Sequence, residues 1–220
     1  DRRRLDEGLA AVRATRAAVG DSMAIMVDMN QAWRMAGDID AATDLPTARR
    51  TAEALRELDV LWMEEPLPEH GLRDLAALRA ATGVRVSGGE MARTFHQLVE
   101  ALQADALDVL QPDVVLAVGM LRARTIGELA LAANRWFTPH TWTNGIGLLA
   151  NLHVVAGVGG GPYVEFPYDP PGWTCERRDF MLAEPIWIEP DGTVAVPDRP
   201  GLGVVLDEDA VRRHACGEER

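Results

Sequence analysis

The feature that most constrains the fold is a short apolar run that ends in two acids and a proline, residues 60–66. Residues 60–63 are Val-Leu-Trp-Met, which predicts a buried strand, and Pro66 ends it because proline has no N–H to donate to a sheet. Glu64 and Glu65 lie at the strand end, where their like charges repel and burial disfavours both. A divalent cation would relieve that cost.

The same arrangement recurs on two other predicted strands. Asp28 follows the apolar run 24–27, and Glu90 follows the run 84–89. A helical pattern comes after each of these strands. The carboxyl ends of parallel strands share one face of a barrel, so acids that are distant in sequence meet there. Carboxylates are ligands that Mg²⁺ prefers, and we therefore expect a Mg²⁺ site made by Asp28, Glu64 and Glu90.

Strands and helices alternate along the whole chain, which predicts an α/β fold with parallel strands. We expect six strands, at 23–28, 60–64, 84–88, 107–110, 135–138 and 163–166. We expect helices at 5–19, 45–58, 72–81, 94–102, 120–133 and 147–156, with Asp44 and Thr94 as helix caps. After these, residues 186–188 and 193–196 predict a β-hairpin, and 207–215 a short helix.

Composition excludes several classes of function. The net charge of −12 over 220 residues argues against a nucleic-acid partner. All basic residues are arginine, so the chain offers no lysine as a proton-abstracting base. No apolar run is long enough for a transmembrane helix. Cys175 and Cys216 have no metal or redox spacing; with no visible signal peptide they predict a cytoplasmic protein, and a single disulfide between them stays an alternative.

Three more strand-end residues suit proton transfer rather than metal binding. They are Asp113, His140 and Glu165. His140 can act as a base if a carboxylate fixes its tautomer, and Asp113 on the preceding strand is placed to do so. Glu165 can act as an acid or hydrogen-bond donor if burial raises its pKa. Any one of these side chains alone is equally consistent with a solvated loop residue or a salt-bridge partner. The prediction rests on their order along successive strands.

These motifs, taken in order, resemble those of the enolase superfamily, specifically the mandelate racemase/muconate lactonizing enzyme family. The matching segments are Val27-Asp28-Met29-Asn30, Glu64-Glu65-Pro66, Gly88-Gly89-Glu90, Gln111-Pro112-Asp113, Pro139-His140, Val164-Glu165 and the Pro/Gly-rich run 197–203. Each motif alone is weak, but together they extend over nearly all of the chain.

The resemblance implies a (β/α)₇β-type barrel, an N-terminal α+β capping domain, and Mg²⁺ held by Asp28, Glu64 and Glu90. It also implies that Asp113 and His140 form the catalytic dyad of the mandelate racemase subgroup and that Glu165 supports an enediolate intermediate. Asn30 and Glu65 match positions near the metal. We expect residues 1–185 to be a partial barrel without its first strands and capping domain, and residues 186–220 to be a segment that packs on that domain.

The predicted function is therefore a Mg²⁺-dependent lyase that dehydrates an acid sugar to a 2-keto-3-deoxy acid. A racemase or epimerase of a 2-hydroxy acid is the alternative, and a non-catalytic metal-binding or oligomer-forming fragment is an alternative of another class. Arg93 could meet the substrate carboxylate or pair with a neighbouring acid, and the loop 31–43 is expected to shape substrate choice. The expected partners are a small carboxylic acid and further copies of the chain, with neither nucleic acid nor membrane.

Overall fold

The computed structural model describes residues 2–34, 37–38 and 41–215. Its centre is a five-stranded sheet in the order β1-β2-β3-β4-β5, and every neighbouring pair is parallel. The strands are β1 (Ile25–Asp28), β2 (Val60–Glu64), β3 (Arg85–Gly88), β4 (Val109–Leu110) and β5 (Trp136–Phe137). Chain order equals spatial order, as in the wall of a barrel, and this confirms the predicted α/β fold with parallel strands.

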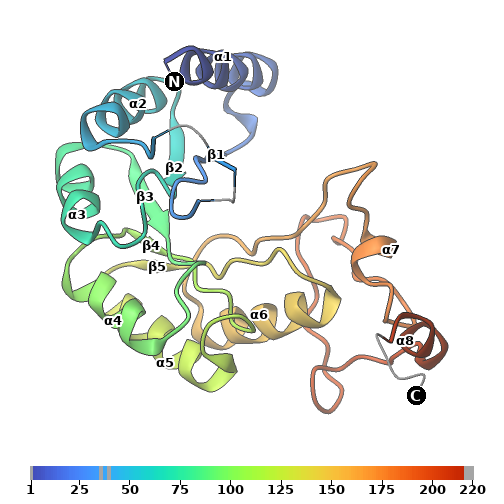
Figure 1. Cartoon of the computed structure of the whole chain (residues 1–220). Coiled ribbons are helices and arrows are strands. Elements are labelled where there is room, and N and C mark those ends of the chain that lie inside the picture. Colours follow the sequence, from blue (N-terminus) through green and yellow to red (C-terminus); the bar gives the residue numbers. More distant parts are fainter. Residues whose placement is uncertain (1, 35–36, 39–40, 216–220) are drawn as a thin grey trace.

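The helices that connect the strands lie outside the sheet, where they form an arc around it (Figure 1). They are α1 (Arg2–Val19), followed by the short 3₁₀ helix η1 (Gly20–Ser22), then α2 (Leu45–Glu57), α3 (Leu72–Ala81), α4 (Phe95–Gln103), α5 (Gly119–Ala132) and α6 (Gly145–Val158). The last helices, α7 (Cys175–Arg178) and α8 (Glu208–His214), belong to a segment that extends away from the sheet (Figure 1).

Predicted helix starts are confirmed where the sequence contains a capping side chain. Asp44 accepts a hydrogen bond from the Thr47 amide at 2.8 Å, and Thr94 forms a reciprocal capping box with Gln97. These caps fix where α2 and α4 begin and therefore how long the loops before them are. Those loops leave the strand ends that carry the acids.

The core lies between the sheet and the helices. Leu55 of α2, Leu78 of α3, Leu98 of α4 and Ile126 of α5 are at most 1% exposed, as is Phe137 of β5. Burial of such side chains stabilises the fold by about 1.5–3 kcal/mol each. The layer of helices therefore holds the strands in register and fixes the relative positions of their carboxyl ends.

The prediction of a sixth strand at 163–166 is wrong for the described residues. After α6 the chain runs beside β5 at Gly160 and Gly161, which pack closely against Phe137 and Thr138. One backbone hydrogen bond joins the two segments, from the Phe137 amide to the Gly160 carbonyl. Residues 163–166 then continue without pairing to another strand. Glu165 is thus carried on an extended loop, and other contacts must hold it.

The predicted hairpin at 186–196 is likewise only a turn. The Glu189 amide donates to the Thr193 carbonyl at 2.8 Å, and the described residues on either side form no strand pair. Trp187 and Ile188 are about half exposed, at 53% and 49%. A two-stranded hairpin without a buried apolar face is marginal in water, which accounts for the missing ladder.

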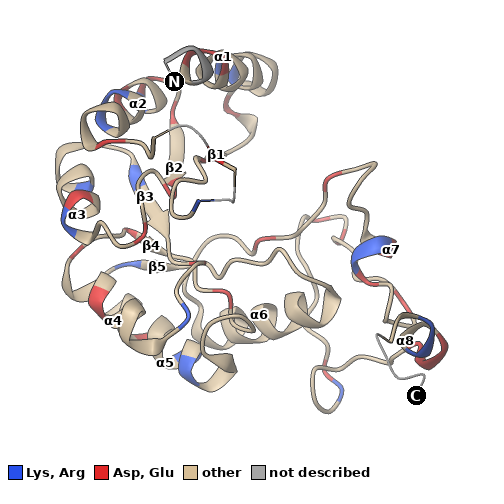
Figure 2. Ribbon diagram, viewed as in Figure 1, with Lys and Arg blue, Asp and Glu red and all other residues tan. Residues whose placement is uncertain are grey.

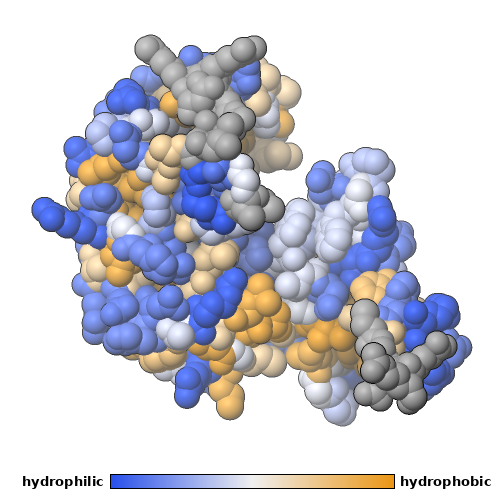
Figure 3. All heavy atoms as spheres, in the orientation of Figure 1, coloured by the Kyte–Doolittle hydropathy of each residue, from blue (hydrophilic) through white to orange (hydrophobic). Residues whose placement is uncertain are grey.

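Figure 3 shows apolar surface in the lower middle of the molecule, over the region of α6.

The loop after β1 is held at its two ends by one side chain. Gln31 donates to the Met29 carbonyl at 2.9 Å and accepts hydrogen bonds from the amide and hydroxyl of Thr43. Two apolar residues of this loop, Met35 and Ile39, lie outside the described residues. Cys175 is buried and free, and Cys216 is likewise outside them.

Basic residues are distributed along the ribbon over several helices, among them α2, α3 and α7 (Figure 2). Within the described part of the chain, no helix has the length and apolar character needed to cross a membrane.

Candidate active site

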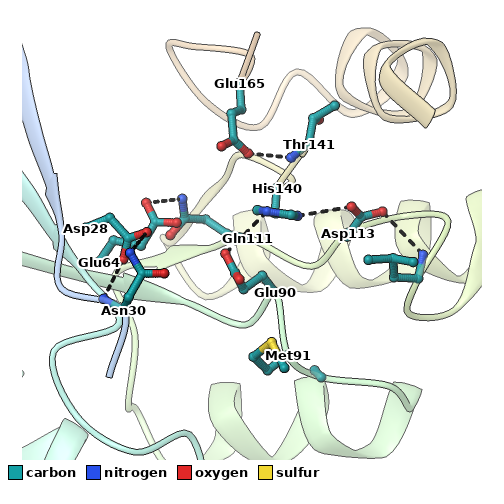
Figure 4. A network of polar contacts seen from close by, with 12 residues as sticks. Asp28, Asn30, Glu64, Glu90, Met91, Gln111, Asp113, His140, Thr141 and Glu165 are labelled. Carbon is teal, nitrogen blue, oxygen red and sulfur yellow. Dashed lines mark hydrogen bonds and ion pairs between the residues drawn. The ribbon is translucent and has the colours of Figure 1, made fainter. Parts of the chain in front are cut away.

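Three carboxylates converge where β1, β2 and β3 end (Figure 4). Asp28 is the last residue of β1 and is in register with Glu64, the last residue of β2. Glu90 follows β3 by two residues, after Gly89, whose φ of +113° is a conformation that a side chain would strain. The parallel register thus brings together three acids that are far apart in sequence, as the strand-end pattern predicts.

Asp28 and Glu64 are each turned toward hydrogen-bond donors. Asp28 accepts from the backbone amide of Asn30 at 2.8 Å and from its side-chain amide at 2.7 Å. One oxygen of Glu64, Oε2, accepts from Gln111 Nε2 at 2.8 Å and from Trp62 Nε1 at 3.2 Å. The other Glu64 oxygen accepts no hydrogen bond from the described residues. Asn30, expected near the metal, is therefore placed directly on a candidate ligand.

His140 lies between two carboxylates, one from each side of the site (Figure 4). Its Nδ1 is 3.0 Å from Asp113 Oδ2, and its Nε2 is 3.4 Å from Glu90 Oε2. The predicted pairing of Asp113 with His140 is therefore present in the structure. Because Nδ1 faces Asp113, Nε2 is the nitrogen that faces the acids and is available for proton transfer.

Asp113 is fixed in place by the backbone that follows it. It is fully buried, and its Oδ1 accepts from the amides of Val115 at 3.0 Å and Leu116 at 3.3 Å. Asn151 of α6, also fully buried, accepts from the Val114 amide at 3.0 Å. One carboxylate oxygen is thus occupied by the backbone and the other is directed at His140, an arrangement that orients the imidazole.

Glu165 completes the arrangement from the loop after α6. Its Oε2 accepts a short hydrogen bond from the backbone amide of Thr141, the residue after His140. This contact places a third carboxyl group beside the histidine even though residues 163–166 form no strand. The hydrogen bond occupies one carboxylate oxygen, so the other, Oε1, is the oxygen that can carry a proton.

Burial and mutual repulsion disfavour charge on the acids. Desolvation raises the pKa of Asp28, Glu90 and Glu165 above their usual values, and nearby carboxylates add to the effect at Glu90 and Glu165. Desolvation also raises the pKa of Glu64 to about 7, to which the charges of Asp28 and Glu165 contribute. The structure therefore places more negative charge at these strand ends than its own residues offset.

His140 shows the complementary effect. Burial disfavours its charged form, but the hydrogen bond with Asp113 and the charges of Glu165, Glu90 and Asp113 outweigh burial and raise the pKa to about 9. These contacts favour the protonated form of His140, whose positive charge faces Glu90.

Glu65, expected near the metal, is buried close enough to Asp28, Glu64 and Glu90 for their charges to affect it. It is 2% exposed, neither carboxylate oxygen has a hydrogen-bond partner among the described residues, and burial together with four neighbouring acids raises its pKa to about 8. It lines a cavity of about 160 Å³ between the sheet and helices α3 and α4, together with Leu75 and Leu98. Its φ of +42° is unusual for a residue with a side chain.

Arg93 lies against the backbone of the loop that carries Glu90. Its Nη1 donates to the Glu90 carbonyl at 2.6 Å and to the Ala92 carbonyl at 3.3 Å. These contacts favour a role for Arg93 in holding that loop, rather than in contacting a substrate carboxylate.

Among the described residues, no three His, Cys, Asp or Glu side chains are gathered closely enough to hold a metal ion. Each of these acids has a partner within the protein: Asp28 accepts from Asn30, Glu64 accepts from Gln111, and Glu90 is paired with His140. The donor set nevertheless fits a hard divalent cation, because it consists of carboxylate oxygens whose combined charge His140 offsets only in part. The residues expected to bind Mg²⁺ are thus brought near one another without forming a complete coordination shell.

Sequence reasoning missed the residues that orient these groups. Trp62, Gln111 and Asn151 bond to candidate site residues or to the adjacent backbone, and Thr141 donates to Glu165. For Gln111 a signal was available, because it belongs to the same motif as Asp113. For Asn151 there was none, since an asparagine within an apolar helix does not indicate which amide it will accept from.

Comparison with known proteins identifies the family. The family described as enolase C-terminal domain-like matches residues 1–210. The chain belongs to this family. Among its relatives, 3,6-anhydro-alpha-L-galactonate cycloisomerase from Streptomyces coelicolor is 34% identical over 97% of this chain and 53% of its own length. Arabinonate dehydratase from Saccharolobus solfataricus is 28% identical over 96% of this chain and 52% of its own.

A solved structure leads to the same family. A racemase from Streptomyces coelicolor with bound magnesium superimposes with a TM-score of 0.78 at 32% identity, over 95% of this chain and 51% of that one. The enolase-family barrel domain expected from the sequence is thereby confirmed. This chain spans about half the length of the relatives it matches. The relatives are enzymes, and their names include dehydratases, cycloisomerases and racemases.

Proposed function

We propose that this enolase-family domain carries the active site of a Mg²⁺-dependent enzyme that removes the proton α to a carboxylate, and that it dehydrates an acid sugar to a 2-keto-3-deoxy acid. The observation that supports this most strongly is the position of His140. Asp113 orients its Nδ1, so that its Nε2 faces a group of acids suited to a cation. A base beside a cation-binding site is the arrangement that such chemistry requires.

In the proposed reaction, His140 Nε2 takes the α-proton, and the electrons of the C–H bond move into the carboxylate to give an enediolate. Glu165, in the protonated form that burial favours by raising its pKa, would donate a hydrogen bond to the developing negative charge. His140 then returns its proton to the β-hydroxyl, which leaves as water, and the resulting enol tautomerises to the 2-keto-3-deoxy acid. The Asp113 hydrogen bond keeps the imidazole in one orientation throughout.

We propose Asp28, Glu64 and Glu90 as the Mg²⁺ ligands, with Asn30, Gln111 and Trp62 holding the carboxylates of Asp28 and Glu64. A cation bound there would supply positive charge to the substrate carboxylate. The same charge would reduce the attraction of Glu90 for the imidazolium and so lower the pKa of His140. The histidine would then be available as a neutral base at neutral pH.

The choice of a sugar acid as substrate is supported by the relatives, two of which are named for galactonate-derived and arabinonate substrates. A racemase or epimerase is the second candidate, supported by the magnesium-bound racemase. That reaction needs a base on each face of the substrate, and the described residues place one histidine in the site. We further propose that the loop 31–43 shapes substrate choice, that the protein forms homo-oligomers, and that it is cytoplasmic.

The test is proton NMR in D₂O, with Mg²⁺ and a panel of sugar acids and simple 2-hydroxy acids. Conversion to a 2-keto-3-deoxy acid supports dehydration. Deuterium at the α-carbon without dehydration supports the racemase or epimerase. Full-length protein that binds Mg²⁺ yet exchanges no α-proton of any acid, indistinguishably from the His140→Asn variant, contradicts both and favours a non-catalytic role.

A further inference from the structure

An arginine–aspartate pair lies fully buried outside the site described above. Arg178 is 1% exposed and Asp179 2% exposed. The guanidinium of Arg178 bonds its neighbour through two parallel contacts, Nε to Oδ1 at 2.7 Å and Nη2 to Oδ2 at 2.6 Å. A buried ion pair is weak evidence for stability by itself, because apolar side chains often serve as well at such positions. The role of this ion pair must therefore be sought in the segments of the chain that it holds in place.

On one side the pair holds the chain directly after Glu165. Arg178 Nη1 donates to the Pro167 carbonyl at 3.1 Å, and its guanidinium carbon lies 4.2 Å from the centre of the Phe166 ring. Phe166 and Pro167 are the next two residues after Glu165. The loop that carries Glu165 has no strand pairing of its own, so these contacts fix its continuation.

A second pair of contacts anchors the arrangement to the C-terminal segment. Arg178 Nη2 donates to the Ile186 carbonyl at 2.7 Å, and the Ile186 amide donates to Asp179 Oδ2 at 2.7 Å. Both backbone groups of one residue are therefore satisfied by this ion pair. The pair is held in place through the tail, and its guanidinium has little freedom to leave Pro167.

On the other side the pair packs against the chain that follows His140. A Cβ at Gly145, the first residue of α6, would lie 2.9 Å from Asp179 Cγ and 2.8 Å from Leu182 Cδ1. Gly145 ends the segment 140–145, whose second residue, Thr141, donates its amide to Glu165. The ion pair thus lies between the two segments that carry His140 and Glu165.

From this placement we propose that Arg178, together with Asp179, is a positioning residue that holds the Glu165 carboxylate against the Thr141 amide, beside His140. The inference rests on the proposed function for the roles of Glu165 and His140. The geometric part, that Arg178 sets the position of Glu165, does not depend on which acid is the substrate.

The first measurement needs no turnover. In the full-length protein, the amide proton of Thr141 should resonate far downfield because it donates to a carboxylate. Glu165→Gln gives the reference for loss of that charge. We expect Arg178→Met to move the Thr141 signal toward the Glu165→Gln position and Arg178→Lys to move it part of the way, because lysine keeps the charge but not the planar fork. Arg177→Met, which removes the neighbouring exposed arginine that bonds the Gly172 carbonyl, should leave the signal unchanged.

Removing Arg178 alone leaves a buried charge on Asp179, which can prevent folding. The double variant Arg178→Met/Asp179→Asn removes both charges together, and Arg178→Lys removes neither. A Thr141 signal at the wild-type position in either of these folded variants would overturn the proposal. Failure of the wild type to exchange the α-proton of any acid would count against the proposed function and leave this result intact.

The second measurement uses turnover. If Arg178 acts through Glu165, Arg178→Lys should lower kcat, by up to about a hundredfold, with little change in KM or in Mg²⁺ affinity. In a Glu165→Gln background the same change should have almost no further effect on kcat, because the group it positions is already lost. Additive losses in the double variant, or a parallel loss of Mg²⁺ affinity, would indicate a general structural role and contradict the proposal.

Discussion

The candidate site has two walls, the acids at the ends of β1–β3 and the Asp113–His140 pair, and buried charge is balanced differently in each. On one wall, at the ends of β1–β3, Asp28, Glu64 and Glu90 carry charge that burial disfavours. On the other wall, Asp113 is fully buried yet fully engaged, with one oxygen on backbone amides and the other on His140. The chain itself supplies hydrogen-bond partners for both oxygens of Asp113, whereas the acids of the first wall stay in an environment that disfavours their charge.

In the absence of a cation, His140 connects these two walls. Its Nε2 faces Glu90 at 3.4 Å, and the surrounding acids raise its pKa, which favours a proton on the imidazole. If the acid wall binds the proposed Mg²⁺, the cation and a protonated His140 would compete for the same negative charge. We therefore expect a bound cation to change the partners of the acid wall while the Asp113–His140 pair stays as it is, and this comparison can be tested from either side.

The largest effect should come from His140→Asn, which removes the proposed base while keeping a hydrogen-bonding side chain. We expect the rate of α-proton exchange to fall by about 10²–10⁴-fold, the usual contribution of a general base. Exchange followed by NMR in D₂O measures it. Mg²⁺ affinity, measured by calorimetry, should not fall, because the imidazolium competes with the cation.

The matched control is His96→Asn, which changes an exposed histidine paired with Glu100 on α4. It should leave exchange unaffected. A His140→Asn variant that binds no Mg²⁺ would show that the two walls are not separable and would break the comparison.

Glu64→Gln should give effects of opposite sign with and without Mg²⁺. Without Mg²⁺ it removes a buried charge beside Asp28 and Glu165, so the melting temperature should rise. Binding at a hundredfold excess over Kd stabilises by about 2.7 kcal/mol, which corresponds to about 5–10 °C for a domain of this size, and the variant should lose that gain. Calorimetric melts with and without Mg²⁺ measure both effects.

Glu128→Gln is the control, because Glu128 pairs with Arg124 on the surface of α5, away from the acids. It should keep the full Mg²⁺-dependent gain. If Glu64→Gln melted lower than the wild type in the absence of Mg²⁺, the acid wall would not be the repulsive element inferred here.

Much of this site follows from the sequence because parallel strands impose it. An apolar run ending in an acid predicts both the strand and the side of the sheet on which the acid lies, so the convergence of Asp28, Glu64 and Glu90 could be predicted from the sequence alone. The pairing of Asp113 with His140 followed from their places on consecutive strands. These predictions depend only on register and chain order.

What could not be predicted depends on contacts that leave no pattern. Glu165 was expected on a strand, but glycines at 160 and 161 carry the chain past β5 without a ladder, and an amide and the Arg178 pair hold it instead. Glu65 was expected near the metal; that it also lines a cavity between the sheet and helices α3 and α4 left no pattern in the sequence.

The stability of the Mg²⁺-free protein should fall as pH rises from about 5 to 9. The folded pKa values of Glu64, Glu65 and His140, about 7, 8 and 9, all lie above their ordinary values of 4.5, 4.5 and 6.5. The folded state therefore holds more protons than the unfolded state in this range. Each group's contribution is complete below its unfolded pKa and is lost as pH rises through its folded pKa.

The expected slope is about 1.4 kcal/mol per pH unit for each extra proton held, or about 3–6 °C in melting temperature for a chain of this length. Thermal melts in metal-free buffers from pH 5 to 9 measure it. Saturating Mg²⁺ should reduce the part of this pH dependence of the melting temperature that arises from Glu64 and His140. A melting temperature that rises with pH in the absence of Mg²⁺ would mean that the acids are already neutralised within the protein.

The smallest effect should come from Gln111→Leu, which removes the 2.8 Å hydrogen bond to Glu64 but no charge. The carboxylate would keep the 3.2 Å bond from Trp62 and lose part of its orientation, so Mg²⁺ affinity should fall by about tenfold, as when the hydrogen-bonding partner of a metal ligand is lost. Calorimetric titration measures the change.

Asn151→Leu is the paired variant on the other wall, since Asn151 supports the Val114 amide beside Asp113. It should lower kcat and leave Mg²⁺ affinity unchanged, because the walls are fixed by separate sets of contacts; equal losses of affinity in both variants would show instead that the site responds as one unit.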